Sequence, residues 1–250
     1  MESRIAGELK LRYQPVALLF TNERPAGAVQ FAEGKWGCVI AMLTAAAKGK
    51  TAVFDRKTVG CAGGITGLGF GCGFEKLPGG IDYFLSCGRG EGFPEGEGYR
   101  KTPEIARGFI DSLPITDIPY TYIVFKPLSA VDPERETPQL IIFYATPDQL
   151  TALVTLANYE TPGTDNVIIP QAAGCQSIGI IPYREAQQEH PRAVVGLLDS
   201  SARPFVPADL LSFTVPFRMF QTMEANIPGS FLERSAWQKV RARIPDPGAE

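Results

Sequence analysis

Glycine is distributed unevenly along this chain, and its distribution restricts what one long segment can form. Residues 60–98 hold 14 of the 26 glycines. Glycine loses more conformational freedom on folding than any other residue, so a helix or strand dense in glycine is weak. The alternation of glycine over residues 67–73 therefore predicts a loop, and the whole segment 60–98 is expected to be one. Two interpretations stay open, a loop that wraps a ligand and a corner where segments pack closely.

Strand and helix patterns alternate on both sides of this segment. Short apolar, β-branched or aromatic runs predict strands over residues 16–20, 51–54, 120–125, 140–144 and 193–198. Helical patterns cover residues 36–48 and 147–158, and the second begins at a proline. The alternation predicts an α/β or α+β fold, with a mixed sheet flanked by helices, in a single domain over residues 1–250.

The two halves of the chain share a weak pattern. In each half, a strand is followed by a Gly-Cys pair, a helix, a second strand and an aspartate, with the pairs at Gly37-Cys38 and Gly174-Cys175. This predicts two pseudo-symmetric half-repeats, about 10–100 and 118–235, that share one site. Cys38 and Cys175 would then approach each other, with Cys61 closing over them. The alternative is that Gly-Cys pairs only let helices pack closely, because free cysteine is often buried.

Charge and hydropathy exclude several partners. The net charge is −3, so no basic field attracts a nucleic acid. The longest apolar runs, at residues 16–20 and 140–145, are far shorter than the ~20 residues that span a bilayer. Residues 1–10 lack the apolar core of a secretory signal, so we expect a cytoplasmic protein with neither nucleic-acid nor membrane partners.

The chain has one histidine and five cysteines, which narrows its chemistry. His190 alone cannot supply the histidines that hydrolytic triads and most zinc or iron sites use. No two cysteines are in C-x-x-C spacing, so zinc-ribbon, ferredoxin and thioredoxin motifs are absent. Cys61 and Cys72 each lie among residues with little or no side chain, which leaves room for a bulky inorganic or anionic group.

Several segments together resemble a known family. They are Cys38 with Ala47-Lys-Gly-Lys50, Cys61-Ala-Gly-Gly64, Gly67-Leu-Gly-Phe70, Pro78-Gly-Gly80, Gly174-Cys175 and residues 193–207. With them, nearly the whole chain resembles the domain of unknown function 169 family of archaeal and anaerobic bacterial proteins. The resemblance implies that Cys38, Cys61 and Cys175 are the cysteines expected in the family, whereas Cys72 and Cys87 look like additions of a narrower group. It implies no established activity.

These observations lead to a hypothesis of thiolate metal binding. Cys38, Cys61, Cys175 and a fourth cysteine, Cys72 ahead of Cys87, are expected to bind an iron–sulfur cluster of the four-iron type, or else a single soft metal. Gly63 and Gly64 would contact this cofactor through their backbone. A closed cluster would transfer electrons to a partner. If only three cysteines bind, an open iron could act as a Lewis acid on a small carboxylate or carbonyl compound, with Arg203 as the anchor of the anion.

Two other functions stay open. The glycine segment and the helix starts near Cys38 and Cys175 could form a metal-free module that binds a small molecule or anion. Alternatively, Cys61 could be the nucleophile of a thiol enzyme, although the sequence offers no evident general base.

Overall fold

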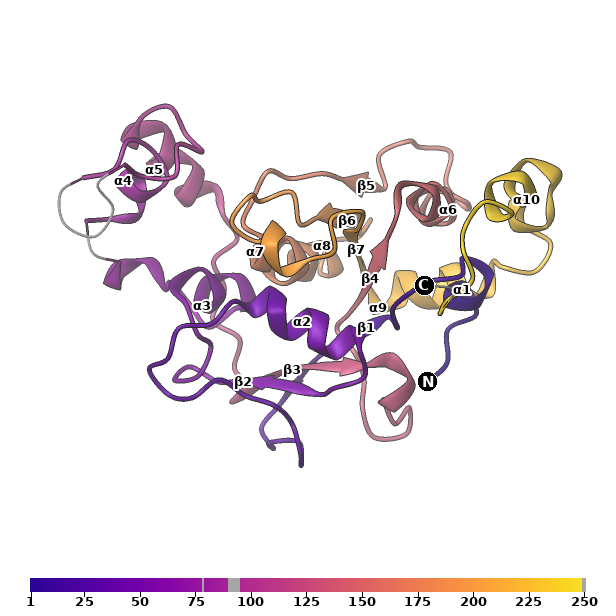
Figure 1. Ribbon diagram of the computed structural model, residues 1–250, viewed down its shortest axis with the longest axis horizontal. Coiled ribbons are helices and arrows are strands. Elements are labelled where there is room, and N and C mark those ends of the chain that lie inside the picture. The colour runs from indigo at the N-terminus through magenta and orange to yellow at the C-terminus, as the bar shows by residue number, and fades with distance from the viewer. Residues whose placement is uncertain (78, 90–94, 249–250) are drawn as a thin grey trace.

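A seven-stranded mixed sheet forms the centre of the protein in the computed structural model, which describes residues 1–77, 79–89 and 95–248 (Figure 1). The strand order is β2-β3-β1-β4-β7-β6-β5. Neighbouring strands are antiparallel except for the parallel pair β5 and β6. The strands are β1 (Val16–Thr21), β2 (Ala52–Phe54), β3 (Tyr122–Pro127), β4 (Leu140–Ala145), β5 (Val167–Ile168), β6 (Ala193–Gly196) and β7 (Leu211–Pro216). The predicted mixed sheet is thus confirmed.

Helices cover both faces of the sheet because side chains alternate along each strand. On β1, Ala17 and Leu19 face one core and Val16 and Leu18 face the other. The first core is closed by α1 (Arg4–Glu8), α6 (Pro147–Ala157), α9 (Phe217–Ala225) and α10 (Ser235–Arg241). The second is closed by α2 (Val39–Ala47), α3 (Ala62–Leu68), α7 (Gly174–Ile178) and α8 (Ile180–Ala186). Cys38 and Cys175 pack in this second core, and Cys61 is the N-cap of α3, one of the helices that close it.

The predicted strands correspond to β1, β2, β3, β4 and β6, and the helix predicted over residues 147–158 is α6. A capping box of Thr146 and Gln149 fixes the start of α6. The helix predicted from residue 36 begins only at Val39, because Cys38 is still extended and serves as its N-cap. The sequence patterns did not predict the short edge strand β5 or the central strand β7.

The prediction that residues 60–98 form one loop is wrong. Residues 62–68 form α3, which ends at Gly69 in the left-handed conformation (φ 95°), and α4 (Ile81–Phe84) follows a 3-10 turn at Phe74–Lys76. Residues 90–94 of the predicted loop and Pro78 lie outside the described residues. Packing overrides propensity in α3, since a Cβ on Gly64 would lie 2.7 Å from Val39 and one on Gly67 would lie 2.7 Å from Cys175. The close-packing interpretation therefore holds for this helix.

The strand order does not separate the two predicted halves. β3 belongs to the half predicted over residues 118–235 but lies between β2 and β1 of the other half, whereas β1 and β4, the matching strands of the predicted pattern, are neighbours at the centre of the sheet. β1 and β4 are antiparallel, as a twofold axis between them requires. Helices α2 and α7 follow in their halves and pack on the same face. The half-repeats themselves stay a prediction.

A small lobe stands beside the sheet at the end nearest α3 (Figure 1). This satellite lobe comprises the described residues of 74–113, including α4 and α5 (Pro103–Ser112). Phe74, Ile81 and Ile110 form a core of its own, separate from the two cores of the sheet. The satellite lobe therefore packs as a separate unit against the rest of the protein, which we call the body.

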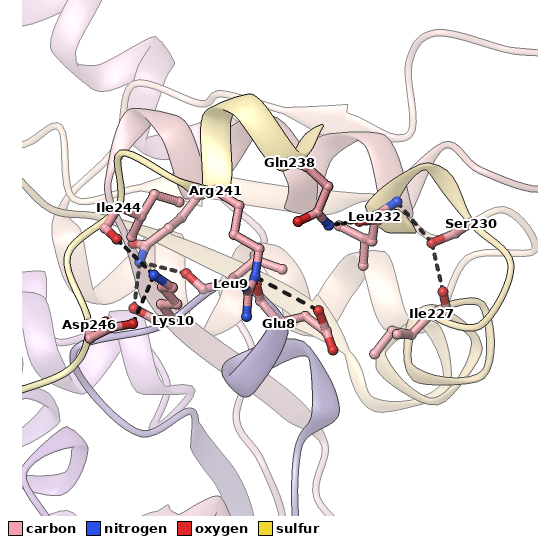
Figure 2. A network of polar contacts seen from close by, with 11 residues as sticks. Glu8, Leu9, Lys10, Ile227, Ser230, Leu232, Gln238, Arg241, Ile244 and Asp246 are labelled. Atoms are coloured by element: carbon pink, nitrogen blue, oxygen red, sulfur yellow. Dashed lines mark hydrogen bonds and ion pairs between the residues drawn. The ribbon is translucent and has the colours of Figure 1, made fainter. Parts of the chain in front are cut away.

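The C-terminal segment packs against the first helix at the opposite end (Figure 2). Arg241 donates to the Glu8 carbonyl at 2.9 Å, and Lys10 donates to the Ile244 carbonyl at 3.2 Å. Lys10 also pairs with Asp246 at 2.8 Å, and Trp237 is buried beneath. This segment packs on the first core, to which Trp237 and Ile244 belong.

We expect Gly67→Ala to destabilise the protein by about 1 to 3 kcal/mol, because the new methyl group would force α3 away from α7. Gly108→Ala, in α5, is the matched control, since a Cβ there would meet nothing within 4 Å. The control should be neutral or stabilising by about 0.5 to 1 kcal/mol, through helix propensity. Urea denaturation measures both. Equal effects of the two substitutions would contradict the packing argument.

Candidate functional site

A cavity of about 500 Å³ lies between the satellite lobe and the body of the protein. We call it the thiol pocket, because Cys38, Cys61 and Cys175 all line it. Most of its wall is apolar, and six aromatic side chains contribute: Trp36, Phe74, Phe84, Tyr99, Phe109 and Phe205. The three cysteines come from separate segments of the chain, and the structure brings all three residues to the lining of one pocket.

The backbone holds Cys38 and Cys61 side by side. Gly37, which precedes Cys38, donates its N–H to the carbonyl of Gly60, which precedes Cys61, at 3.3 Å. This contact needs two glycines, because a Cβ on Gly37 would lie 2.3 Å from the Phe31 ring and one on Gly60 would lie 2.5 Å from the Gly37 carbonyl. Gly60 also has a φ of 88°, which favours glycine. The N-termini of α2 and α3, where the two cysteines are the N-caps, therefore lie side by side.

Cys175 reaches the pocket from α7. Its thiol donates to the Gly63 carbonyl of α3 at 3.0 Å, and the residue as a whole is 8% exposed. Gly174 fits beneath Ala202, to which a Cβ would come within 2.8 Å. Close packing of helices alone would also produce these contacts. What packing alone does not require is the opening of Cys38, Cys61 and Cys175 onto one cavity.

Burial and neighbouring thiols raise the pKa values of the pocket cysteines. Burial raises the pKa of Cys61, and the proximity of Cys38 adds to it, while the N–H of Gly64, which donates to the Cys61 sulfur at 3.2 Å, opposes it. Burial also raises the pKa of Cys38. The pKa of Cys175 lies well above its ordinary value through burial and through both other cysteines. Without a cation, the three thiols are therefore neutral at pH 7.

A polar network lies beside the thiols. Asp199 accepts from the Gly174 N–H at 3.1 Å and from the Ser201 N–H and hydroxyl at 3.0 and 2.8 Å. It follows Leu197, a buried residue in the left-handed conformation (φ 63°) that turns the chain after β6. Desolvation, then Asp199, raises the pKa of Tyr99. Asp199 thus fixes the start of α7 and faces the pocket.

The other predicted site residues have different positions. Gly63 lines the pocket, and Gly64 donates to the Cys61 sulfur. Cys72 and Cys87 are exposed and lie outside the pocket lining. Arg203 also lies outside it, and its guanidinium donates to the carbonyls of Leu210, Pro207 and Ala208. His190 lies in a different cavity.

Within residues 1–77, 79–89 and 95–248, no group of three or more His, Cys, Asp or Glu side chains is arranged so that it could hold a metal ion. A single-ion site is therefore not formed in this part of the chain. Across the same residues, no helix combines the length and the apolar character needed to cross a bilayer.

Sequence reasoning missed the contribution of the satellite lobe. Tyr99 and Arg100 line the thiol pocket, and Arg100 stacks on Phe109 with its guanidinium carbon 4.1 Å from the ring centroid. No periodic pattern links these residues to the cysteines. Their only sequence signal is an arginine next to an aromatic residue in a glycine-rich segment.

The fold and the site define a mixed-sheet α/β protein with a pocket bordered by three thiols. The chain belongs to the domain of unknown function 169 family, described as DUF169, Uncharacterised ArCR, whose model matches residues 4–226. This confirms the resemblance found in the sequence. No curated protein and no solved structure matches the chain.

We expect the metal-free protein to lose stability as the pH rises above 9.0, the ordinary pKa of a cysteine thiol. Above this pH, Cys175 of the unfolded chain loses its proton while Cys175 of the folded chain keeps it. Its contribution to the slope of unfolding free energy against pH is at most about −1.4 kcal/mol per pH unit, up to the raised pKa of the folded state.

Urea denaturation of the wild type and of Cys175→Ser between pH 7 and 10.5, roughly the range in which thiols titrate, measures this contribution. The variant should show a shallower decline. Cys175→Ala should match it, because the difference comes from the proton and not from the shape of the side chain. Parallel curves for wild type and variants would contradict the assignment.

Proposed function

We propose that this protein binds an iron–sulfur cluster through Cys38, Cys61 and Cys175 at the border of the thiol pocket, with one iron left accessible to a small molecule. The observation that carries the proposal is the convergence of the three thiols on one largely apolar cavity. Soft thiolates are the usual ligands of such clusters. The exposure of Cys72 and Cys87 favours three protein ligands over four.

An iron–sulfur cluster needs a wider spacing of its cysteine ligands than a single metal ion does. Ligands at about 2.3 Å from one tetrahedral ion lie within roughly 4 Å of each other. The thiolates of a four-iron cluster each bind a different iron, so they stand farther apart. Cys38 raises the pKa of Cys61, and both raise the pKa of Cys175, whereas no group of three or more His, Cys, Asp or Glu side chains in the described part of the chain could hold a metal ion.

The protein's own residues would prepare the site in three ways. Backbone contacts between Gly37 and Gly60 fix the spacing of Cys38 and Cys61. The Gly64 N–H donates to the Cys61 sulfur, and such hydrogen bonds tune cluster potentials. Apolar walls limit water, so a bound cation would shift the thiols to thiolates more strongly than in solvent. When bound, the cluster would supply Lewis-acid or redox chemistry.

A metal-free binding function is the second candidate, and the pocket itself favours it. A cavity of about 500 Å³ with aromatic walls and a few polar groups has the size and lining of small-molecule sites. A thiol enzyme has less support, because burial raises the pKa of Cys61 and His190 lies in another cavity. Cys61 is thus expected to alkylate more slowly than free cysteine.

Anaerobic purification from iron-replete cells, followed by iron and acid-labile sulfide analysis, tests the cluster. We expect about four irons and four sulfides per chain. Cys38→Ser, Cys61→Ser and Cys175→Ser should each lose most of the iron, because each removes one of three ligands.

Cys72→Ser and Cys87→Ser are the matched controls, since both side chains are exposed. Both should keep the wild-type iron content. Thermal unfolding shows whether each variant is folded, so that loss of iron is separated from loss of structure. A colourless, iron-free wild-type protein would end the cluster proposal and leave the metal-free pocket as the function.

A further inference from the structure

We propose that the thiol pocket binds a carboxylic acid with an apolar, ring-containing body, and that Arg100 of the satellite lobe binds its carboxylate. This inference rests on the proposed function for the role of the thiols as one border of the site. The remainder of the argument comes from the lobe, which the cluster proposal does not use.

The size and lining of the cavity define the body of the ligand. At about 30 Å³ for each water-sized group, 500 Å³ holds roughly 15 to 20 non-hydrogen atoms. Phe74, Phe84 and Phe109 enter from the lobe, and Trp36 and Phe205 enter from the body. Aromatic walls of this kind favour flat ring systems, through stacked and edge-to-face contacts.

Arg100 is the only Lys, Arg or His among the described residues that line the pocket. It is half-buried, its guanidinium lies over the Phe109 ring, and its Nη1 donates to the Tyr99 carbonyl. No carboxylate of the described residues forms an ion pair with it. A guanidinium held flat against a ring keeps donors for a planar carboxylate, which it can bind through two hydrogen bonds.

Two carboxylates in the lining could oppose an anion. Asp199 is already satisfied by the Gly174 and Ser201 donors, which spread its charge. Glu97 is exposed and lies near the Tyr99 hydroxyl. Arg203 was expected to bind the anion, but its guanidinium donates to backbone carbonyls. We therefore assign that role to Arg100.

Isothermal titration with three probes that share one ring body tests the inference: 2-naphthoate, 2-naphthamide and 2-naphthylmethylamine. We expect the acid to bind at least about tenfold more tightly than the amide, with the amine weakest. Arg100→Gln should remove the preference for the acid and leave the affinity for the amide within about threefold. Glu97→Gln should tighten the binding of the acid, because it removes a nearby negative charge.

Arg135→Gln is the control, since the Arg135 side chain is 86% exposed and lies outside the pocket. Thermal unfolding of Arg100→Gln and of Arg100→Lys, which keeps the charge, shows whether the lobe stays folded. Any of four results would overturn the inference. These are equal affinity for the acid and the amide, tighter binding of the amine than of the acid, unchanged binding of the acid by Arg100→Gln, and no binding of any probe.

Titrations on protein whose iron content has been determined distinguish the two proposals. If the anaerobically purified protein is iron-free and binds 2-naphthoate through Arg100, the ligand inference is supported and the cluster proposal is contradicted. A full iron content without selective binding of the acid would do the reverse.

Discussion

The close approach of α3 to α2 and α7 is the contact on which the site depends. Glycines on α3 leave room for Val39 on one side and for Cys175 on the other. Just before the helices, Gly37 and Gly60 let two extended segments share a hydrogen bond. A Cβ at Gly37, Gly60, Gly64 or Gly67 would lie within 2.3 to 2.7 Å of a neighbouring atom, so the segments would have to move apart. These glycines therefore act by the side chains they lack, and Gly60 also has a left-handed backbone.

This packing gives the two faces of the sheet different roles. One face is a continuous hydrocarbon core, closed by α6, α9 and the C-terminal helix, and it holds the fold together. The other face carries the three cysteines, and there the satellite lobe leaves a cavity where it meets the body. Asp199 lines this cavity and comes two residues after Leu197, whose left-handed backbone is of the kind often associated with functional sites. One face of the sheet thus stabilises the fold and the other carries the pocket, because successive side chains on β1 and β4 point to opposite faces.

The two proposals concern opposite walls of one pocket. The body supplies thiols whose pKa is raised, so a cation would have to displace their protons. The lobe supplies rings and one arginine, a wall suited to an organic anion. A ligand between them would touch groups that lie far apart in the chain, from Cys38 to Phe205. The family match over residues 4–226 includes all the described residues that line the pocket, and α10 beyond it packs in the first core.

The sequence by itself determined the mixed sheet, five of its strands, the helix at residues 147–158 and the three cysteines of the pocket, because side-chain period and Gly-Cys spacing are local signals. It did not determine that the glycine-rich segment contains a helix, since propensity argues against one and only contacts with Val39 and Cys175 reverse the balance. Nor did it distinguish Arg203 from Arg100, or exclude Cys72 from the pocket lining. Those outcomes depend on where a side chain points after the chain has folded. Two residues with the same chemistry then differ only in whether backbone carbonyls, solvent or a cavity surrounds them.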